Sequence, residues 1–232
     1  MNDILRNTIL LLVVFFYIYF IVAIAASLKK RIDPMYARKF IHIAVSTRIL
    51  FWPLVKDPSG KYIATFGLLL YATISLLDAL GVIHLETFEE GLKRYGSRLE
   101  LAFGPVSYPI AQAIFVFFYR HHPLSGAAIG ILGLGDGMAA VVGYRKPIVK
   151  RRIGNSSRSL AGFIAFVVFG ILGGLIYQYY LYITGFCQRL IPLEKIALMT
   201  VLAAIVEALV PGELDNIPIA LAILVGYYMR DF

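Results

Sequence analysis

The sequence predicts an all-α integral membrane protein, a polytopic helical bundle of about eight transmembrane helices (seven to nine) with its N-terminus outside. Of 232 residues, 59% are hydrophobic and 16% are charged, whereas a soluble domain has roughly 45–50% and about 25%. The mean hydropathy is +0.78. Apolar segments follow one another almost from end to end, so we predict a single transmembrane domain over residues 1–232.

Eight apolar segments give this helix count, because a helix needs about 20 apolar residues to cross roughly 30 Å of hydrocarbon. Three are long and clear: residues 4–27, 62–83 and 160–184. The other five are shorter or interrupted by charged, glycine or proline residues: 40–55, 103–119, 124–143, 196–210 and 217–229.

Loop charges set the predicted orientation. With the N-terminus outside, the first three inner connections hold fourteen Lys and Arg residues and the outer segments hold seven. Cytoplasmic loops carry such an excess. The net charge of +8 then fits contact with anionic lipid headgroups of the bilayer, and we expect no nucleic-acid partner. The sequence does not indicate the oligomeric state.

The most informative polar residue inside an apolar segment is Asp136. A carboxylate within a membrane span costs at least about 2.5–3.5 kcal/mol, so it normally faces the bundle interior and has a function. Gly133, Gly135 and Gly137 surround it. These glycines would let a backbone or a phosphate approach closely, or would only pack helices together.

A basic cytoplasmic loop, residues 144–158, follows this segment. It contains six basic residues: Arg145, Lys146, Lys150, Arg151, Arg152 and Arg158. It ends in hydroxyl residues and an arginine just before an apolar helix, an arrangement that suits a phosphate. Beside the buried carboxylate, the loop predicts a nucleoside triphosphate held with a divalent cation, most naturally Mg²⁺.

Two further groups of polar residues fall on the same predicted side of the bilayer. Arg38, Lys39 and His42 share one face of a helix by their spacing. Near the C-terminus, Glu207 precedes a short acidic connection that contains Glu213, Asp215 and Asn216, where an inner loop should be basic. We therefore predict one active site at the cytoplasmic face.

Taken together, these segments resemble the phytol kinase/dolichol kinase family of polyprenol kinases. The resemblance runs from about Tyr36 to the C-terminus and depends on the order and spacing of four patterns. These are Arg38-Lys39-x-x-His42, Gly135-Asp136-Gly137-x-Ala139-Ala140-x-x-Gly143, Arg158-Ser159-x-x-Gly162, and Glu207-Ala208-Leu209 with Asp215-Asn216-Ile217-Pro218-Ile219. The family's third pattern usually reads Lys-Ser-x-Glu-Gly-Ser, so this chain differs at positions 158, 161 and 163.

The resemblance implies a kinase that phosphorylates the hydroxyl of a membrane-embedded isoprenoid alcohol, with CTP as the donor and Mg²⁺ as the cofactor. Asp136, Lys39 and His42 would be catalytic, and Asp136, Glu207 and Asp215 would bind the metal. Tyr108 and Asn216 would contact the alcohol. The nucleotide would be bound by basic residues, glycines and one serine: Arg38, Gly135, Gly137, Gly143, Lys150, Arg151, Arg152, Arg158, Ser159 and Gly162.

Two alternatives remain open at the level of sequence. A CTP-dependent cytidylyltransferase that makes CDP-activated lipids would release pyrophosphate instead of CDP. A transporter or lipid-binding membrane protein would use the basic loop for an anionic ligand and consume no nucleotide.

Overall fold

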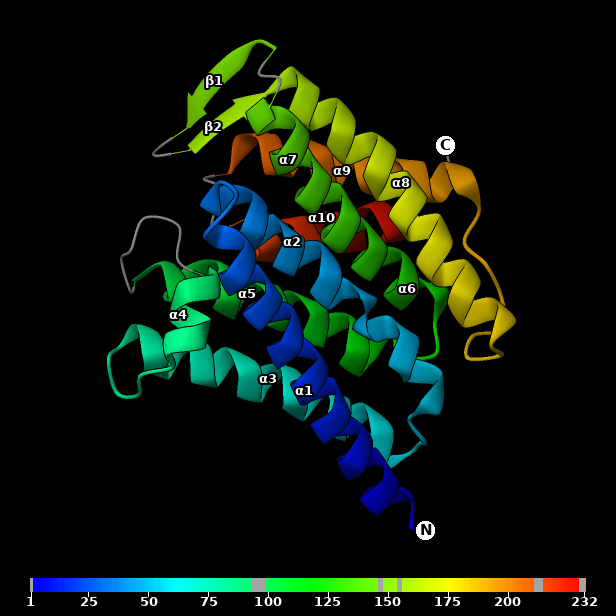
Figure 1. Cartoon of the computed structure of the whole chain (residues 1–232). Coiled ribbons are helices and arrows are strands. Elements are labelled where there is room, and N and C mark those ends of the chain that lie inside the picture. Colours follow the sequence, from blue (N-terminus) through cyan, green and yellow to red (C-terminus); the bar gives the residue numbers. More distant parts are fainter. Residues whose placement is uncertain (1, 93–98, 146–147, 154–155, 211–214, 230–232) are drawn as a thin grey trace. The chain divides into compact units, whose positions relative to one another are not determined.

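The computed structural model describes residues 2–92, 99–145, 148–153, 156–210 and 215–229. It contains two compact units, Met1–Arg120 and His121–Phe232 (Figure 1). Both units are helical, which confirms the predicted all-α class. That the two units act as one transmembrane domain stays a prediction.

The first unit is built from helices α1 (Asp3–Lys29), α2 (Pro34–Ser46), α3 (Ser59–Ala79), α4 (Glu86–Leu92) and α5 (Leu99–Phe118). A 3-10 helix, η1 (Thr47–Leu54), continues α2. Asp33 accepts a hydrogen bond from the Met35 amide and so caps α2, and Pro34 occupies the first turn, where its missing N–H costs nothing. Short local signals of this kind define where the helices begin.

The core of the first unit gathers small and branched side chains from α1, α2 and α5. Val22, Ala25, Ala37 and Leu101 lie at its centre and are almost fully buried. Alanines at two of these positions let α1 and α2 pack closely. At the other end of α1, Asn7 donates to the Lys56 carbonyl and to the hydroxyl of Ser59, which fixes the start of α3.

The second unit begins with one interrupted helix: α6 (Pro123–Gly130), the π-helical turn η2 (Ile131–Asp136) and α7 (Gly137–Arg145). The antiparallel strands β1 (Lys150–Ile153) and β2 (Ser156–Ser159) follow, and then α8 (Leu160–Ile183), α9 (Leu193–Leu209) and α10 (Asn216–Tyr228). Figure 1 shows the hairpin linking α7 to α8. We expected residues 144–158 to be a loop; the strand pairing is an addition that the sequence analysis did not predict.

Glycines bring α8 against the interrupted helix. A Cβ atom built on Gly130 would lie 2.1 Å from the carbonyl oxygen of Gly173, and one on Gly135 would lie 3.2 Å from the Cα of Gly170. Side chains are therefore excluded at this crossing, and the two backbones touch. This is the packing mode that small residues allow between helices in a bilayer.

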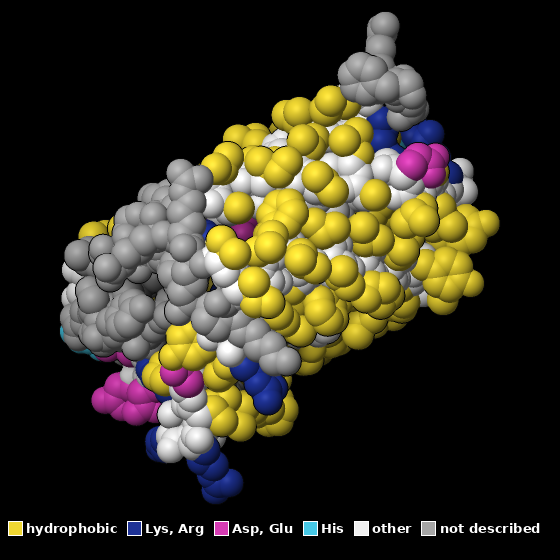
Figure 2. Space-filling view, turned by 90° about the horizontal axis from the view of Figure 1, so that it is seen from above, with side chains coloured by type: hydrophobic (Ala, Val, Ile, Leu, Met, Phe, Trp, Pro, Cys, Tyr) yellow, Lys and Arg dark blue, Asp and Glu magenta, His cyan; other side chains and the backbone are white. Residues whose placement is uncertain are grey.

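Each of the eight segments predicted from hydropathy is mostly helical, although residues 80–83 lie beyond the end of α3. Not all of these helices reach the length of a membrane span, so the predicted count of about eight spans exceeds what the described residues show. Five helical stretches in the described residues are long and apolar enough to cross a membrane: Asp3–Lys29, Ser59–Ala79, Leu101–Phe118, Pro123–Arg145 and Leu160–Ile183. Asn216–Tyr228 is a shorter apolar helix. Figure 2 shows hydrophobic side chains over most of the described surface on the face it presents. The N-out orientation stays a prediction.

Replacing Gly130 with alanine should destabilise the second unit. Its Cβ would meet backbone atoms of Gly173, which cannot rotate away, so we expect a loss of at least about 1–3 kcal/mol. The matched control is Gly104→Ala on α5, where a Cβ would meet only the end of the Arg38 side chain at 3.4 Å. Thermal unfolding in detergent should show a lower Tm for the first variant alone; equal Tm values would contradict the tight crossing.

Candidate functional site

Three carboxylates meet inside the second unit. Asp136, Glu207 and Asp215 each offer an oxygen, and these oxygens lie within 4.8 Å of one another. Their residues are 1%, 4% and 2% exposed. These are the three residues for which the sequence predicts a metal site, and the structure brings them together. Their role as ligands stays a prediction.

Each of the three carboxylates lies at a point where a helix begins, ends or is interrupted. Asp136 is the last residue of the π turn η2, and π turns often lie at functional sites because they displace side chains from the regular helical face. Glu207 lies in the last turn of α9. Asp215 is the N-cap residue of α10 and immediately precedes Asn216, which is also buried.

Arg158 ties two of these carboxylates together. Its Nη1 donates to Oε1 of Glu207, and its Nη2 donates to Oδ2 of Asp215 at 2.7 Å and to the Val210 carbonyl at 3.1 Å. Burial lowers the pKa of Arg158, but the nearby charges of Glu207 and Asp215 outweigh burial, so the pKa lies above its ordinary value. The guanidinium is therefore charged and bridges β2, α9 and α10.

The charges of this cluster suit a divalent cation. With all three acids ionised, the three carboxylates and the guanidinium carry a net charge of −2. Every candidate ligand atom is a carboxylate oxygen, the donor type that Mg²⁺ prefers, and Mg²⁺ commonly uses few carboxylates together with phosphate oxygens and water. Asp136, Glu207 and Asp215 therefore fit Mg²⁺ by their chemistry and by their burial.

Gly143, Ser159 and Gly162 have structural contacts of their own. The Ser159 hydroxyl caps α8 by accepting from the Gly162 amide at 3.1 Å. A Cβ on Gly143 would lie 2.9 Å from the Ser159 hydroxyl, and one on Gly162 would lie 2.9 Å from the Ala139 carbonyl. Gly143, Ser159 and Gly162 thus hold α7 against the start of α8. Their predicted contact with a nucleotide is a separate expectation.

Several predicted nucleotide ligands have side chains outside the described part of the chain. Lys150, Arg151 and Arg152 have a described backbone in β1, but their side chains are not described; Glu213 lies outside the described residues altogether. Gly137 begins α7 next to Asp136. The proposed phosphate contacts of the three basic residues stay predictions.

The remaining predicted residues belong to the first unit. On α2, His42 stacks on Tyr108 of α5 with ring centroids 3.9 Å apart, and the Tyr108 hydroxyl donates to the His42 carbonyl at 3.1 Å. One turn earlier on both helices, the Arg38 guanidinium lies near Gly104. Lys39 is half-buried beside them. The structure groups these residues with one another, and their joining the carboxylate cluster stays a prediction.

Sequence reasoning missed two polar groups in the first unit. Arg48 and Gln112 are buried and hydrogen-bonded to each other, although they are far apart in the chain. Asp78, His84 and Glu89 offer ligand atoms within 4.8 Å of one another, with only Asp78 buried. Both groups could have been found from the sequence, because Arg48 and Asp78 are charged residues inside apolar segments.

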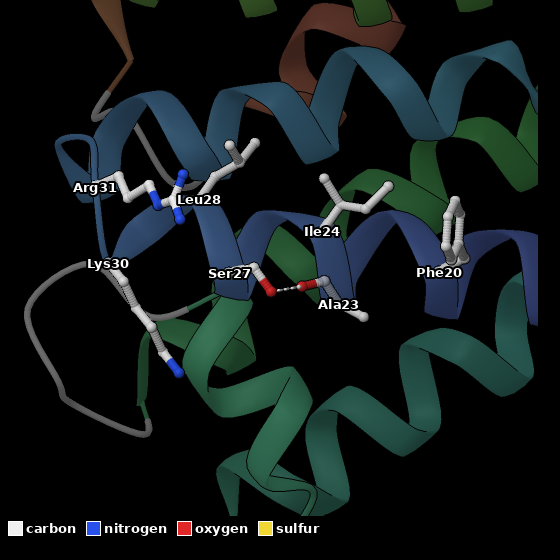
Figure 3. Close-up of a pocket in the computed structure, with 7 residues that line it drawn as sticks. All are labelled: Phe20, Ala23, Ile24, Ser27, Leu28, Lys30 and Arg31. Atoms are coloured by element: carbon white, nitrogen blue, oxygen red, sulfur yellow. Dashed lines mark hydrogen bonds between the residues drawn. The ribbon is translucent and has the colours of Figure 1, made fainter.

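A shallow groove of about 520 Å³ runs along the C-terminal half of α1 (Figure 3). Its wall is apolar apart from the Ser27 hydroxyl, which donates to the Ala23 carbonyl of the same helix. Lys30 and Arg31 lie at one end of the groove. An apolar surface that ends in basic residues is typical of a membrane helix that meets acyl chains and headgroups.

Comparison with known proteins identifies relatives over most of the chain. It is 30% identical to a probable chloroplastic phytol kinase 1 of Glycine max over 80% of this chain and 64% of the relative. It is 34% identical to a chloroplastic farnesol kinase of Arabidopsis thaliana over 67% of this chain and 52% of the relative. It is 28% identical to the chloroplastic phytol kinase 1 of the same plant over 91% of this chain and 72% of the relative.

The chain thus spans about half to two thirds of the length of the first two relatives. No family model matches the sequence, and no solved structure matches it. These relatives support the family of phytol kinases and related polyprenol kinases for this chain.

Proposed function

We propose that the chain is a lipid-alcohol kinase that transfers the terminal phosphoryl group of a nucleoside triphosphate, CTP by the family resemblance, to a membrane-embedded prenol. The observation that carries the proposal is the buried cluster of Asp136, Glu207 and Asp215 in a chain whose relatives are named phytol kinase and farnesol kinase. Phosphoryl transfer depends mainly on aligning the reactants and on neutralising charge. The cluster would supply the carboxylates that bind the metal ion of such a site.

The proposed reaction forms a bond between the alcohol oxygen and the γ-phosphorus and breaks the bond from that phosphorus to the oxygen that bridges it to the β-phosphorus. The products are a prenyl monophosphate, a nucleoside diphosphate and a proton. A bound Mg²⁺ would neutralise charge on the transferred phosphoryl group. Asp136, Glu207 and Asp215 would hold that ion.

The other residues of the proposal act on phosphate and on the alcohol. Arg38, Lys39 and the basic residues of the hairpin segment would bind the triphosphate, since guanidinium groups pair with phosphate oxygens through two parallel hydrogen bonds. His42 would accept the proton of the alcohol or orient a phosphate. Its ring is fixed by Tyr108, which limits the positions that its nitrogens can take. Tyr108 and Asn216 would contact the prenol.

The surroundings of the cluster favour a lipid substrate. The unit that holds the carboxylates exposes large apolar side chains. Four of them lie on α8: Ile164, Val168, Leu172 and Ile176. A long isoprenoid chain would remain in contact with such surfaces while only its hydroxyl reaches the polar site. The active site would then lie at the cytoplasmic face, in accordance with the loop charges.

The decisive experiment incubates the purified chain in detergent with Mg²⁺, one of CTP, ATP, GTP or UTP, and a panel of alcohols: phytol, geranylgeraniol, farnesol, dolichol and diacylglycerol. We expect a prenyl monophosphate and CDP, identified by mass spectrometry. Release of pyrophosphate with a CDP-lipid would instead identify a cytidylyltransferase. Absence of any nucleotide consumption across the panel would contradict the proposal.

Replacing Asp136 with asparagine should lower kcat by about 100-fold or more, since it removes a charged ligand of the proposed Mg²⁺ and keeps nearly the same shape. The matched control is Glu194→Gln, which neutralises an exposed acid in the first turn of α9 and should leave turnover unchanged. Steady-state kinetics with the preferred nucleotide and alcohol would decide. Full activity of the asparagine variant would remove Asp136 from the site.

Replacing Arg38 with glutamine should raise the KM for the nucleotide by about tenfold or more, because a charged hydrogen bond to phosphate is lost. The KM for the alcohol should change little. Lys56→Gln removes one exposed charge from the same unit and serves as the control. An unaltered nucleotide KM in the Arg38 variant would show that Arg38 does not bind the phosphates.

A further inference from the structure

The contacts of Arg158 overlap with those that a metal ion at this cluster would make. Its guanidinium donates to carboxylate oxygens of Glu207 and Asp215, two of the three residues whose oxygens could hold a cation. The side chains of Arg158, Glu207 and Asp215 are 14%, 5% and 3% exposed, so little water is present to screen their charges. A guanidinium and a divalent cation compete for the same oxygens, and they also repel each other.

The observed arrangement does not satisfy all donors of Arg158. Its Nε is buried and has no hydrogen-bond partner among the described residues, although Nη1 and Nη2 are bonded. A buried donor that makes no hydrogen bond costs free energy. The guanidinium is therefore held by its charge more than by complete hydrogen bonding, and another arrangement could satisfy it better.

The backbone position of Arg158 places it next to the start of α8. It lies in β2 of the hairpin, directly before Ser159, which caps the first turn of α8. Amide groups at the start of a helix and an arginine beside them form a setting in which phosphate is stabilised. A phosphate bound at that end of α8 would offer the guanidinium an alternative partner to the carboxylates.

We propose that Arg158 is a positioning residue that fills the Glu207–Asp215 part of the cation site when no metal is bound and leaves it when a divalent cation binds. The guanidinium supplies one positive charge among three carboxylates in the metal-free chain and so keeps them together. On cation binding it becomes available to phosphate oxygens. This last step rests on the proposed kinase function; the competition for the carboxylates does not.

The competition can be measured by Mn²⁺ binding to the full chain in detergent without nucleotide, followed by the loss of the free-ion signal in electron paramagnetic resonance. Arg158→Gln should bind Mn²⁺ about tenfold or more tightly than the wild-type chain, comparable with the effect of one nearby charge on a carboxylate. Arg158→Lys keeps a point charge but cannot bridge two carboxylates, so its affinity should be intermediate. Unchanged or weaker binding by a folded glutamine variant would overturn the proposal.

Arg189→Gln is the matched control. Arg189 belongs to the same unit, is exposed and lies by His122, away from the three carboxylates. It removes the same charge from the unit and should leave the Mn²⁺ affinity unchanged. An equal gain in affinity for both glutamine variants would mean that net charge alone is responsible, and would overturn the competition.

A second measurement needs no variant of Arg158 and so covers the case in which the variants do not fold. Phenylglyoxal modifies accessible guanidinium groups, and peptide mass spectrometry can compare its rate at Arg158 with its rate at Arg189. Mn²⁺ should accelerate modification of Arg158 relative to Arg189. No acceleration under conditions in which Mn²⁺ binds would contradict the release of Arg158. Neither measurement uses turnover, so the product assay still tests the kinase function independently.

Discussion

Three carboxylates can share a buried site only when positive charge lies among them, because desolvation and mutual repulsion both oppose their ionisation. In the second unit that charge comes from Arg158, whose guanidinium reaches Glu207 at the end of α9 and Asp215 before α10. It also binds the Val210 carbonyl, so the segment between these helices is anchored by one side chain. The arrangement of β2, α9 and α10 therefore depends on this ion pair.

The third carboxylate reaches the cluster through backbone geometry. Gly130 and Gly135 allow the interrupted helix to touch α8, and the π turn η2 ends at Asp136. A side chain at either glycine would separate the two helices, and a regular helix would rotate Asp136 relative to its neighbours. Gly130 and Gly135 can therefore be required without contacting a ligand, because they determine where the Asp136 carboxylate lies.

Hydropathy predicted the helices well because burial in a bilayer imposes a long apolar run on each of them. It also singled out Asp136, since a carboxylate inside such a run is rare. The partner of Glu207 could not be predicted in the same way. Arg158 is 49 residues away from Glu207 in the chain, and nothing in a local pattern distinguishes an arginine that binds carboxylates from one that binds phosphate. The π turn and the β1–β2 hairpin likewise depend on tertiary packing.

The departures from the family pattern at positions 158 and 161 can be understood from the same contacts. Lysine, the usual residue at the first position, offers a compact point charge, whereas the fork of Arg158 bonds Glu207, Asp215 and Val210 at once. The family's glutamate would add another acid in the first turn of α8, and Ala161 omits it. This chain therefore combines a wider cationic group with one fewer acid. Such a combination favours an arrangement in which Arg158 bonds to Glu207 and Asp215 together. Two positions match the family pattern and have structural roles: the Ser159 hydroxyl caps α8, and a side chain at Gly162 would meet the Ala139 carbonyl of α7.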